Sequence, residues 1–406
     1  MATDVEVQTT LPMRPKQPRQ QLTKGMEHMR SYVIVPDTPP QTPPSGEDAY
    51  GVPAAYEPMR KPTTDSTSNV QKRSDPFQFG TRFLEDGDDI FAHNAWDHVE
   101  VDPQYSEFIE QQTLFQRENQ VSDFDKRRFN DKPEKWWDKF YSNNQANFFK
   151  DRKWLVQEFP VLGEITKAEH GPCTVLEVGA GAGNTAFPLL AMNQNPELRV
   201  RACDYSAKAI DVIRSQPAYI EQSQPAVLQA NVWDAASDSL PAGLELGSVD
   251  LVLMIFIFSA LSPSQWTQCV QNIWSVLKPG GEVLFRDYGR GDLAQVRFKK
   301  GRYLEENFYV RGDGTRVYFF EEQELRDIWS GEAVGGDSTK EERSEEAGSD
   351  EANRFEVVNL AVDRRMLVNR QRKIKMYRCW MQGRFRKPKI SENGQDRAQS
   401  SDTEAG

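Results

Sequence analysis

The sequence predicts an α/β fold in which helices cover both faces of a doubly wound, mostly parallel sheet. Strand-like apolar runs alternate with helix-like stretches through the second half of the chain, as in sheets whose parallel strands are joined by crossover helices. One run, residues 249–258, is apolar almost throughout, which is typical of a central strand covered on both faces. A glycine-rich turn follows the first strand-like run. Ligands of such sheets bind beyond the carboxyl ends of the strands, which are expected at Gly179, Asp204, Asp234, Ile255 and Asp287.

The expected elements follow one another in a regular order. Strands are expected at residues 174–178, 200–203, 226–229, 249–256 and 282–285. Helices are expected between them at residues 185–192, 207–214 and 264–277. Two aromatic helices are expected before this core, at residues 103–119 and 134–159, and two strands after it, at residues 355–360 and 375–381.

Composition divides the chain into five parts. Residues 1–75 are rich in Pro, Thr, Gln and Ser and are expected to be a disordered tail. Residues 76–170 form an aromatic, helical region, and residues 171–390 form the sheet core. The core is interrupted at residues 331–354 by an acidic insertion with Gly and Ser, expected to be disordered, and residues 391–406 are a polar tail.

Several classes of protein are excluded by composition. The four cysteines and four histidines are scattered, so neither a disulfide framework nor a metal site is expected. No apolar run reaches membrane-spanning length, and the first residues carry acids without an apolar core. A reduced protein of the cytoplasm, or also of the nucleus, is therefore expected. The net charge of −11 is an average over strongly acidic and strongly basic segments.

The glycine turn follows a strand that ends in an acid. Glu177 is followed by Gly179, Gly181 and Gly183 at alternate positions, and then by a helix-like stretch. Glycine suits a backbone that takes positive φ or lies against a ligand, and the helix start offers free N–H groups. In the G-x-G-x-x-G turn of dehydrogenases the third glycine would stand at Asn184. The pattern instead resembles motif I of class I S-adenosylmethionine (SAM) methyltransferases, E-x-G-x-G-x-G.

Three acids stand at later strand ends. Asp204 can accept hydrogen bonds from both hydroxyls of a ribose, and its alternative role is a helix cap. Asp234 can bind an adenine amino group or be an ordinary loop acid. Asp287 lies in the segment Arg286-Asp287-Tyr288, which we predict to be catalytic, with a structural ion pair to Arg286 or another cation as the alternative.

Basic residues concentrate near the end of the core. Eleven lie between residues 364 and 390 with no acid among them, and seven more lie between residues 290 and 316. Asp313-Gly314 between two aromatic runs predicts a hairpin. Charge runs are usually solvated faces, but two such runs on the catalytic side of the sheet favour RNA binding with a strong dependence on salt.

Four segments give a more specific resemblance, to the tRNA N3-methylcytidine (m3C) methyltransferases. They are residues 79–84 with 93–97, residues 137–141 with 147–152, residues 284–289 with 297–298, and residues 363–365 with 369–370. The segment His93-Asn-Ala-Trp-Asp97 resembles the fungal-type branch that acts on threonine tRNAs, and serine tRNAs are also family substrates. The resemblance implies a seven-stranded, mostly parallel sheet with an antiparallel last strand, and a tRNA- and SAM-contacting role for residues 76–170.

The resemblance also implies a reaction and its residues. A methyl group would pass from SAM to N3 of cytidine 32 in the tRNA anticodon loop, leaving S-adenosylhomocysteine. From the chemistry of this reaction, and not from the resemblance, Asp287 is our candidate for stabilising the cationic product base. The cofactor contacts would be Trp137, Tyr141, Gly179, Gly181, Asp204, Asp234, Ala235 and Ile255. Trp137 and Tyr141 are four residues apart and therefore share one helix face. This spacing is consistent with an aromatic lid over the sulfonium of SAM, and equally with a pair of core aromatic residues.

Other functions stay open. The chain could methylate a small molecule or a protein, which would leave the basic runs unexplained, or be a non-catalytic RNA-binding subunit, against which the intact glycine turn argues. A dehydrogenase is disfavoured by Asn184. An aminoacyl-tRNA synthetase is a candidate partner for a tRNA methyltransferase.

Overall fold

The computed structural model describes residues 58–60, 82–101, 103–222, 227–331 and 354–389. The expected acidic insertion, the polar tail and nearly all of the expected N-terminal tail lie outside these ranges. One part of the expected tail is ordered. Pro58–Met59 forms strand β1, which pairs antiparallel with β3, Glu100–Val101, so the prediction of disorder is wrong there.

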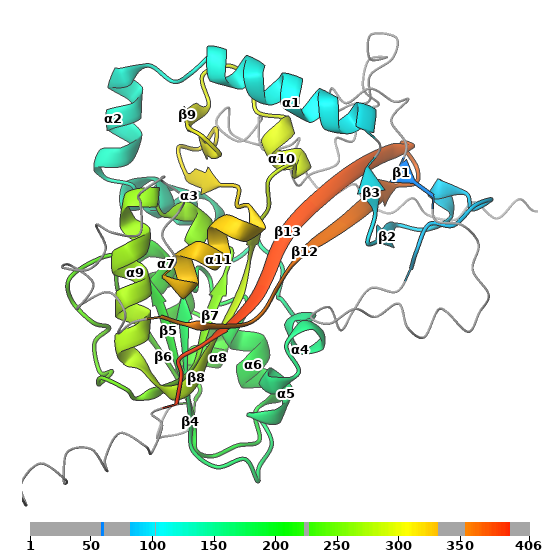
Figure 1. The fold of residues 1–406 in the computed structure, drawn as a ribbon. Helices are drawn as coiled ribbons and strands as arrows, with labels where there is room; N and C mark the ends of the chain where they lie inside the picture. The colour runs from blue at the N-terminus through cyan, green and yellow to red at the C-terminus, as the bar shows by residue number, and fades with distance from the viewer. Residues whose placement is uncertain (1–57, 61–81, 102, 223–226, 332–353, 390–406) are drawn as a thin grey trace, which may run out of the picture. The chain divides into compact units, whose positions relative to one another are not determined.

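The core is an eight-stranded sheet with the order β2-β12-β13-β8-β7-β4-β5-β6 (Figure 1). Five strands run parallel, and β13 is antiparallel to its neighbours, as predicted. Their bounds are β4 Cys173–Val178, β5 Leu198–Asp204, β6 Leu228–Val232, β7 Val249–Ile255, β8 Leu277–Tyr288, β12 Glu356–Asn369 and β13 Ile374–Arg386. The predicted number of seven is one too few, because β2, Ala95–Asp97, adds an antiparallel edge strand from the N-terminal region.

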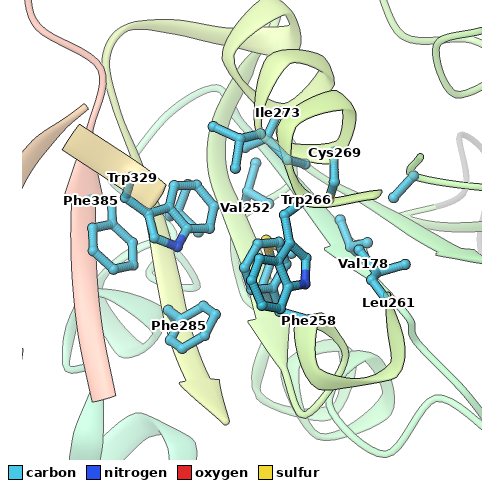
Figure 2. Packing of buried hydrophobic residues seen from close by; sticks show 14 of the residues in the cluster. Val178, Val252, Phe258, Leu261, Trp266, Cys269, Ile273, Phe285, Trp329 and Phe385 are labelled. Carbon is cyan, nitrogen blue, oxygen red and sulfur yellow. The ribbon is translucent and has the colours of Figure 1, made fainter. Parts of the chain in front are cut away.

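Two helical layers bury the faces of this sheet. One face carries α9, Pro263–Val276, and α11, Glu322–Ser330. Figure 2 shows this layer, where the Trp329 and Phe385 rings stack at a centroid distance of 4.6 Å. The other face carries α4, α5, α6 and α7, at Leu155–Glu158, Val161–Glu164, Ala186–Met192 and Ala207–Arg214. Both layers are continuous with the strands, which explains why β7 is apolar except at Asp250.

The N-terminal region contributes three longer helices. They are α1 Pro103–Glu118, α2 Asp123–Asp131 and α3 Glu134–Asn144. The first matches the expected helix at residues 103–119. The second expected helix, residues 134–159, is wrong in length, since the chain leaves the helix at Gln145 with φ of 48° and resumes only in the short α4. A separate three-stranded sheet holds β9 Tyr303–Glu305, β10 Phe308–Val310 and β11 Arg316–Tyr318.

The predicted hairpin is present, as β10 and β11, but its turn packs inward. A Cβ at Gly314 would overlap the Trp136 ring, so the turn lies directly against the start of α3. The hairpin therefore braces α3, and its strand side chains are buried.

Candidate active site

The glycine turn after β4 lies tightly under neighbouring side chains. Gly179 and Gly181 have φ of 66° and 58°, a region that other residues rarely adopt. A Cβ at Gly179 would overlap Ile257, and a Cβ at Gly181 would overlap the Tyr141 hydroxyl. The turn can thus present backbone to a ligand only with glycine at both positions.

Asp204 at the end of β5 faces the same turn. Its two carboxylate oxygens accept hydrogen bonds from the backbone N–H groups of Gly181 and Ser206, each at 2.9 Å. Because a carboxylate has about four acceptor positions, two remain for the hydroxyls of a ribose. The alternative role as a helix cap is wrong, since the Ser206 hydroxyl caps α7 by accepting from the Ala209 N–H. Burial raises the pKa of Asp204 to about 6.

Helix α3 carries Trp137 and Tyr141 over the glycine turn. Their rings stack at a centroid distance of 6.1 Å, and Tyr141 is buried while Trp137 is half-buried. Asp138, between them, fixes the helix to the start of α7. Its Oδ1 accepts from the Ser206 hydroxyl at 2.7 Å and from the Lys208 N–H at 3.1 Å. Both predicted aromatic residues therefore lie at the site, in a helix that is attached to α7.

The remaining predicted cofactor residues lie at the carboxyl ends of β6 and β7. Asp234 accepts from the Ala236 N–H at 2.9 Å and so shapes the turn after β6, while the Ala235 carbonyl accepts from Asn272 of α9 at 2.9 Å. Ile255 is the buried last residue of β7. All eight predicted cofactor residues thus lie along one edge of the sheet or in the helix that covers it.

Two charged residues beneath the turn were missed by the sequence analysis. Glu177 is buried, and the cation that pairs with its carboxylate is Arg152, whose Nη1 lies 3.8 Å away. Burial raises the pKa of Glu177 to about 7. The Arg152 N–H donates to the Asn184 carbonyl and its guanidinium to the Thr185 hydroxyl. Arg152 stands in a segment quoted for the family resemblance, which was the available signal.

The three residues of the predicted catalytic segment lie in different surroundings. Asp287 has no exposed surface, and it accepts from the Ser259 and Tyr288 N–H groups at 2.9 and 2.8 Å. Burial raises the pKa of Asp287 to about 6. Among the described residues it makes no ion pair with Arg286 or with another cation, so the structural ion pair is not found. Tyr288 is half-exposed at the end of β8, and its ring lies 5.0 Å from that of Phe256.

Arg286 belongs to a buried ion-pair network and lies away from the cleft, which corrects its predicted catalytic role. Its guanidinium pairs with Asp363 at 2.6 Å and lies between the rings of Trp154 and Trp380. The side chain points to the sheet face opposite that of Asp287, because neighbouring residues of a strand alternate between faces. Asp363 also pairs with Arg365 at 2.9 Å.

Many residues of the two basic runs are also neutralised or face away from the cleft. Arg384 and Arg386 both pair with Glu282, and Arg378 pairs with Asp292. Because β13 is antiparallel, Arg384 to Lys389 lie toward the amino end of β8, opposite the glycine turn. Arg316 is buried and donates to the Ala260 carbonyl. The expectation that both runs lie on the catalytic side of the sheet is therefore wrong for these residues.

The comparisons with known proteins agree with this geometry. Residues 176–283 match the family described as "Methyltransferase domain". "tRNA(Thr) (cytosine(32)-N(3))-methyltransferase" of Saccharomyces cerevisiae is 46% identical over 327 residues, 80% of this chain and 48% of that protein. "tRNA N(3)-methylcytidine methyltransferase trm140" of Schizosaccharomyces pombe is 43% identical over 313 residues, 76% of this chain and 92% of that protein.

The chain belongs to the tRNA N3-methylcytidine methyltransferase family. It spans about half the length of the S. cerevisiae member and nearly all of the S. pombe member. Among solved structures, a SAM-dependent methyltransferase of Methanosarcina mazei aligns with a TM-score of 0.40 at 18% identity, covering 57% of this chain and 99% of that one. Membership in this m3C methyltransferase family implies SAM as the methyl donor, and the fold is the Rossmann-like fold of class I methyltransferases. No helix of the described ranges is long and apolar enough to cross a membrane.

Proposed function

We propose that this protein transfers a methyl group from SAM to N3 of cytidine 32 in the anticodon loop of threonine tRNAs, serine tRNAs or both. The observation that carries this proposal is the extended similarity to m3C methyltransferases, which includes the helices in front of the sheet. The exposed cations Lys299 and Lys300, which follow β8 in the chain, suit a polyanionic substrate.

The residues at the cleft fit SAM. The turn at Gly179 and Gly181 accepts no Cβ, which suits a ligand lying against the backbone. Asp204 has acceptor capacity left for the ribose hydroxyls. Glu177 offers a buried carboxylate whose ion-pair partner Arg152 is 3.8 Å away, and this negative charge suits the ammonium of the methionine part. Asp234 and Ala235 would face the adenine, and Trp137 with Tyr141 would cover the sulfonium.

The reaction demands positioning more than proton transfer. SAM supplies an electrophilic methyl group on a sulfonium. The lone pair of N3 in neutral cytosine forms the new N–C bond while the C–S bond breaks, so no base removes a proton before attack. The protein must therefore hold the base in line with the methyl group, which is an entropic contribution to the rate. Since N3 is hydrogen-bonded in a duplex, the base must come from a single-stranded loop and turn outward.

Phe256 and Tyr288 are our candidates for holding the base. Phe256 has φ of 60°, a conformation that costs of order 1–3 kcal/mol in a non-glycine residue and therefore calls for a compensating role. Its N–H donates to the Arg286 carbonyl at 2.7 Å, which fixes the strained turn at the end of β7. The Phe256 ring contacts Tyr288 and lies 5.9 Å from the Arg152 guanidinium. An aromatic pair with a nearby cation suits a flipped pyrimidine.

Asp287 would act on this site indirectly, as a positioning residue. Its carboxylate holds the Ser259 N–H and thus the turn that follows Phe256 and Ile257. We expect Asp287→Asn to lower kcat about tenfold, because one of two charge-assisted hydrogen bonds is lost, and to leave the Kd for SAM within about twofold. Steady-state kinetics and calorimetry would measure the two effects.

A pH profile separates this role from a simple loss of folding. With its pKa near 6, Asp287 loses its charge as the pH falls below 6, so kcat of the wild type should fall there. The Asp287→Asn variant should keep a flatter profile at saturating SAM. A wild-type kcat in the Asn variant would contradict the positioning role.

The two neighbouring tryptophans of α3 allow a matched comparison of SAM affinity. We expect Trp137→Ala to raise the Kd for SAM about 2- to 30-fold, because an aromatic face over a cation contributes about 0.5–2 kcal/mol. Trp136→Ala is the control, since Trp136 packs on the Gly314 turn and lies outside the cleft. Equal losses in both variants, measured by calorimetry, would mean that Trp137 acts only through packing.

The function itself is tested by incubating the protein with SAM and total yeast tRNA, followed by nucleoside mass spectrometry. New 3-methylcytidine is the expected product, and mapping of the modified tRNAs would locate it at position 32. Methyl groups only on another nucleoside, or on no RNA at all, would overturn the proposal. Adding threonyl- or seryl-tRNA synthetase to the same assay tests the candidate partner, which should raise the rate on its own tRNA.

A further inference from the structure

A hollow opens at the tip of the β12–β13 hairpin, far from the glycine turn. It has a volume of about 810 Å³ and an open mouth. One wall comes from the hairpin turn, including Asn369, Arg370, Gln371 and Lys373. The other comes from the N-terminal region, through Phe91 and Asn94. Asn94 lies in the His93–Asp97 segment that the sequence analysis singled out and that the cofactor cleft does not use.

The strand register fixes where this hollow lies. Tyr288 at the end of β8 pairs with Trp380, which pairs with Asp363 of β12. Strand β12 then continues for six residues to Asn369, which at about 3.3 Å per residue is about 20 Å. Since β12 runs parallel to β8, this extension points past the edge that carries the cofactor cleft. Figure 1 shows the hairpin reaching beyond the sheet to β2 and α1.

The lining of the hollow is cationic. Arg370 and Lys373 contribute positive charge, Asn369 and Gln371 contribute amides, and no acid lines it. Neither cation makes an ion pair among the described residues. Lys373 instead lies with its Nζ 4.4 Å from the centroid of the Phe91 ring. The nearby Asp89 is already engaged as a cap, accepting from the Phe91 N–H at 2.9 Å.

The tip is also pre-organised. The outer half of the hairpin has a small core of its own, in which Tyr377 packs on Tyr105 of α1 with ring centroids 4.5 Å apart. Trp96 of β2 is buried in the same core, and its indole N–H donates to the Ile90 carbonyl at 2.7 Å. The Asn369 side chain accepts from the Arg372 N–H and so shapes the turn. The cations are therefore presented from a fixed platform.

We infer that this hollow binds the sugar–phosphate backbone of the duplex stem next to the methylated loop. The inference rests on the proposed function, because it takes tRNA as the substrate. The hollow lies about 20 Å past the strand ends that carry the cofactor cleft, which is farther than a single nucleotide reaches, so a substrate held in the cleft would meet it with the duplex next to the loop. Guanidinium, ammonium and amide groups all donate to phosphate oxygens, as a contact without sequence preference requires.

The test uses the full chain with the substitutions Arg370→Ala and Lys373→Ala combined. Its ligands are a fluorescent anticodon arm with a complete stem and one whose stem keeps only the pairs next to the loop. For the complete arm we expect about a tenfold weaker Kd and a slope of log Kd against log salt that is lower by about two. For the short arm we expect Kd to change less than twofold. With tRNA as substrate, KM should rise while kcat and the Kd for SAM stay unchanged.

Lys389→Ala is the matched control. Lys389 belongs to the same basic run, but it is exposed at the other end of the sheet, where its side chain lies against Gly280. Its removal should leave both affinities unchanged. Equal loss for both arms in the double variant, or no loss for either, would overturn the inference while wild-type methylation still supports the proposed function. Tighter binding of an acidic peptide than of the complete arm would assign the hollow to a protein partner and overturn it as well.

Discussion

Asp204→Ala is expected to abolish measurable SAM binding, with a Kd at least 100-fold higher than that of the wild type. The substitution removes the acceptors for the ribose hydroxyls, and hydrogen bonds to charged groups contribute about 1.5–3 kcal/mol each. It also leaves the Gly181 N–H without its acceptor, which loosens the glycine turn. Isothermal titration calorimetry with SAM would measure the change.

The control is Asp211→Ala, which removes an exposed carboxylate that pairs only with Lys208 on the surface of α7. SAM affinity should not change in this variant. Circular dichroism would show whether Asp204→Ala keeps the fold, and a folded variant that binds SAM with unchanged affinity would refute the assignment of Asp204 to the ribose.

The pH dependence of SAM binding follows from the same carboxyl group. Its pKa of about 6 lies above its value near 4 in an unfolded chain, so acidification protonates Asp204 in the folded protein first. Protonation of Asp204 has opposite effects on the stability of the fold and on the affinity for SAM. This group stabilises the fold most below pH ~4 and loses that contribution as the pH rises through 6, whereas the ribose needs the ionised form. SAM affinity should therefore fall below pH 6 while the protein is still folded.

Asp363→Ala is expected to lower the free energy of unfolding by about 3–5 kcal/mol, because it leaves the buried Arg286 guanidinium without its carboxylate and removes one of the three that pair with Arg365. Arg286 and Arg365 both lose this partner, and Arg286 is only 4% exposed. Urea unfolding followed by tryptophan fluorescence would measure the loss. Glu158 at 3.0 Å and Asp97 at 3.5 Å also pair with Arg365, so that arginine keeps two carboxylate partners.

The comparison for this effect is Glu164→Ala, which breaks an exposed ion pair with Lys167. Such pairs contribute about 0–1 kcal/mol, so the unfolding midpoint should hardly move. A loss below about 1 kcal/mol in Asp363→Ala would mean that water or rearranged side chains solvate the two arginines. Replacing Arg286 by Met in the Asp363→Ala background should then recover part of the stability, since one unpaired charge is removed.

Local patterns in the sequence predicted the central sheet and the glycine turn well. Helix α7 was predicted with both ends correct, because Ser206 is a strong N-cap and an apolar stripe follows it. Strand β6 was placed at residues 226–229 but occupies Leu228–Val232, since a short apolar run does not fix its own register. The break at Gln145 carries neither Pro nor Gly, so no local signal marked it.

The parts that the sequence did not predict depend on contacts between distant residues. The basic run after residue 364 has no acid nearby in sequence, yet Asp292 and Glu282 neutralise three of its arginines across the sheet. Asp287 was expected in the cleft because it ends a strand. It is instead buried, where it accepts from the Ser259 N–H, and its neighbour Arg286 points to the opposite face of the sheet and pairs with Asp363. The motifs predicted the candidate site, whereas the burial of its acids depends on packing that the motifs do not show.

The position of β13 has a consequence for protein synthesis. This strand is the last of the described strands to leave the ribosome, yet it pairs with β8 on one side and β12 on the other. A nascent chain that ends before Ile374 therefore presents the apolar edge of β8 without its neighbour. Such intermediates aggregate readily, and truncated chains of this length should require chaperones to stay in solution.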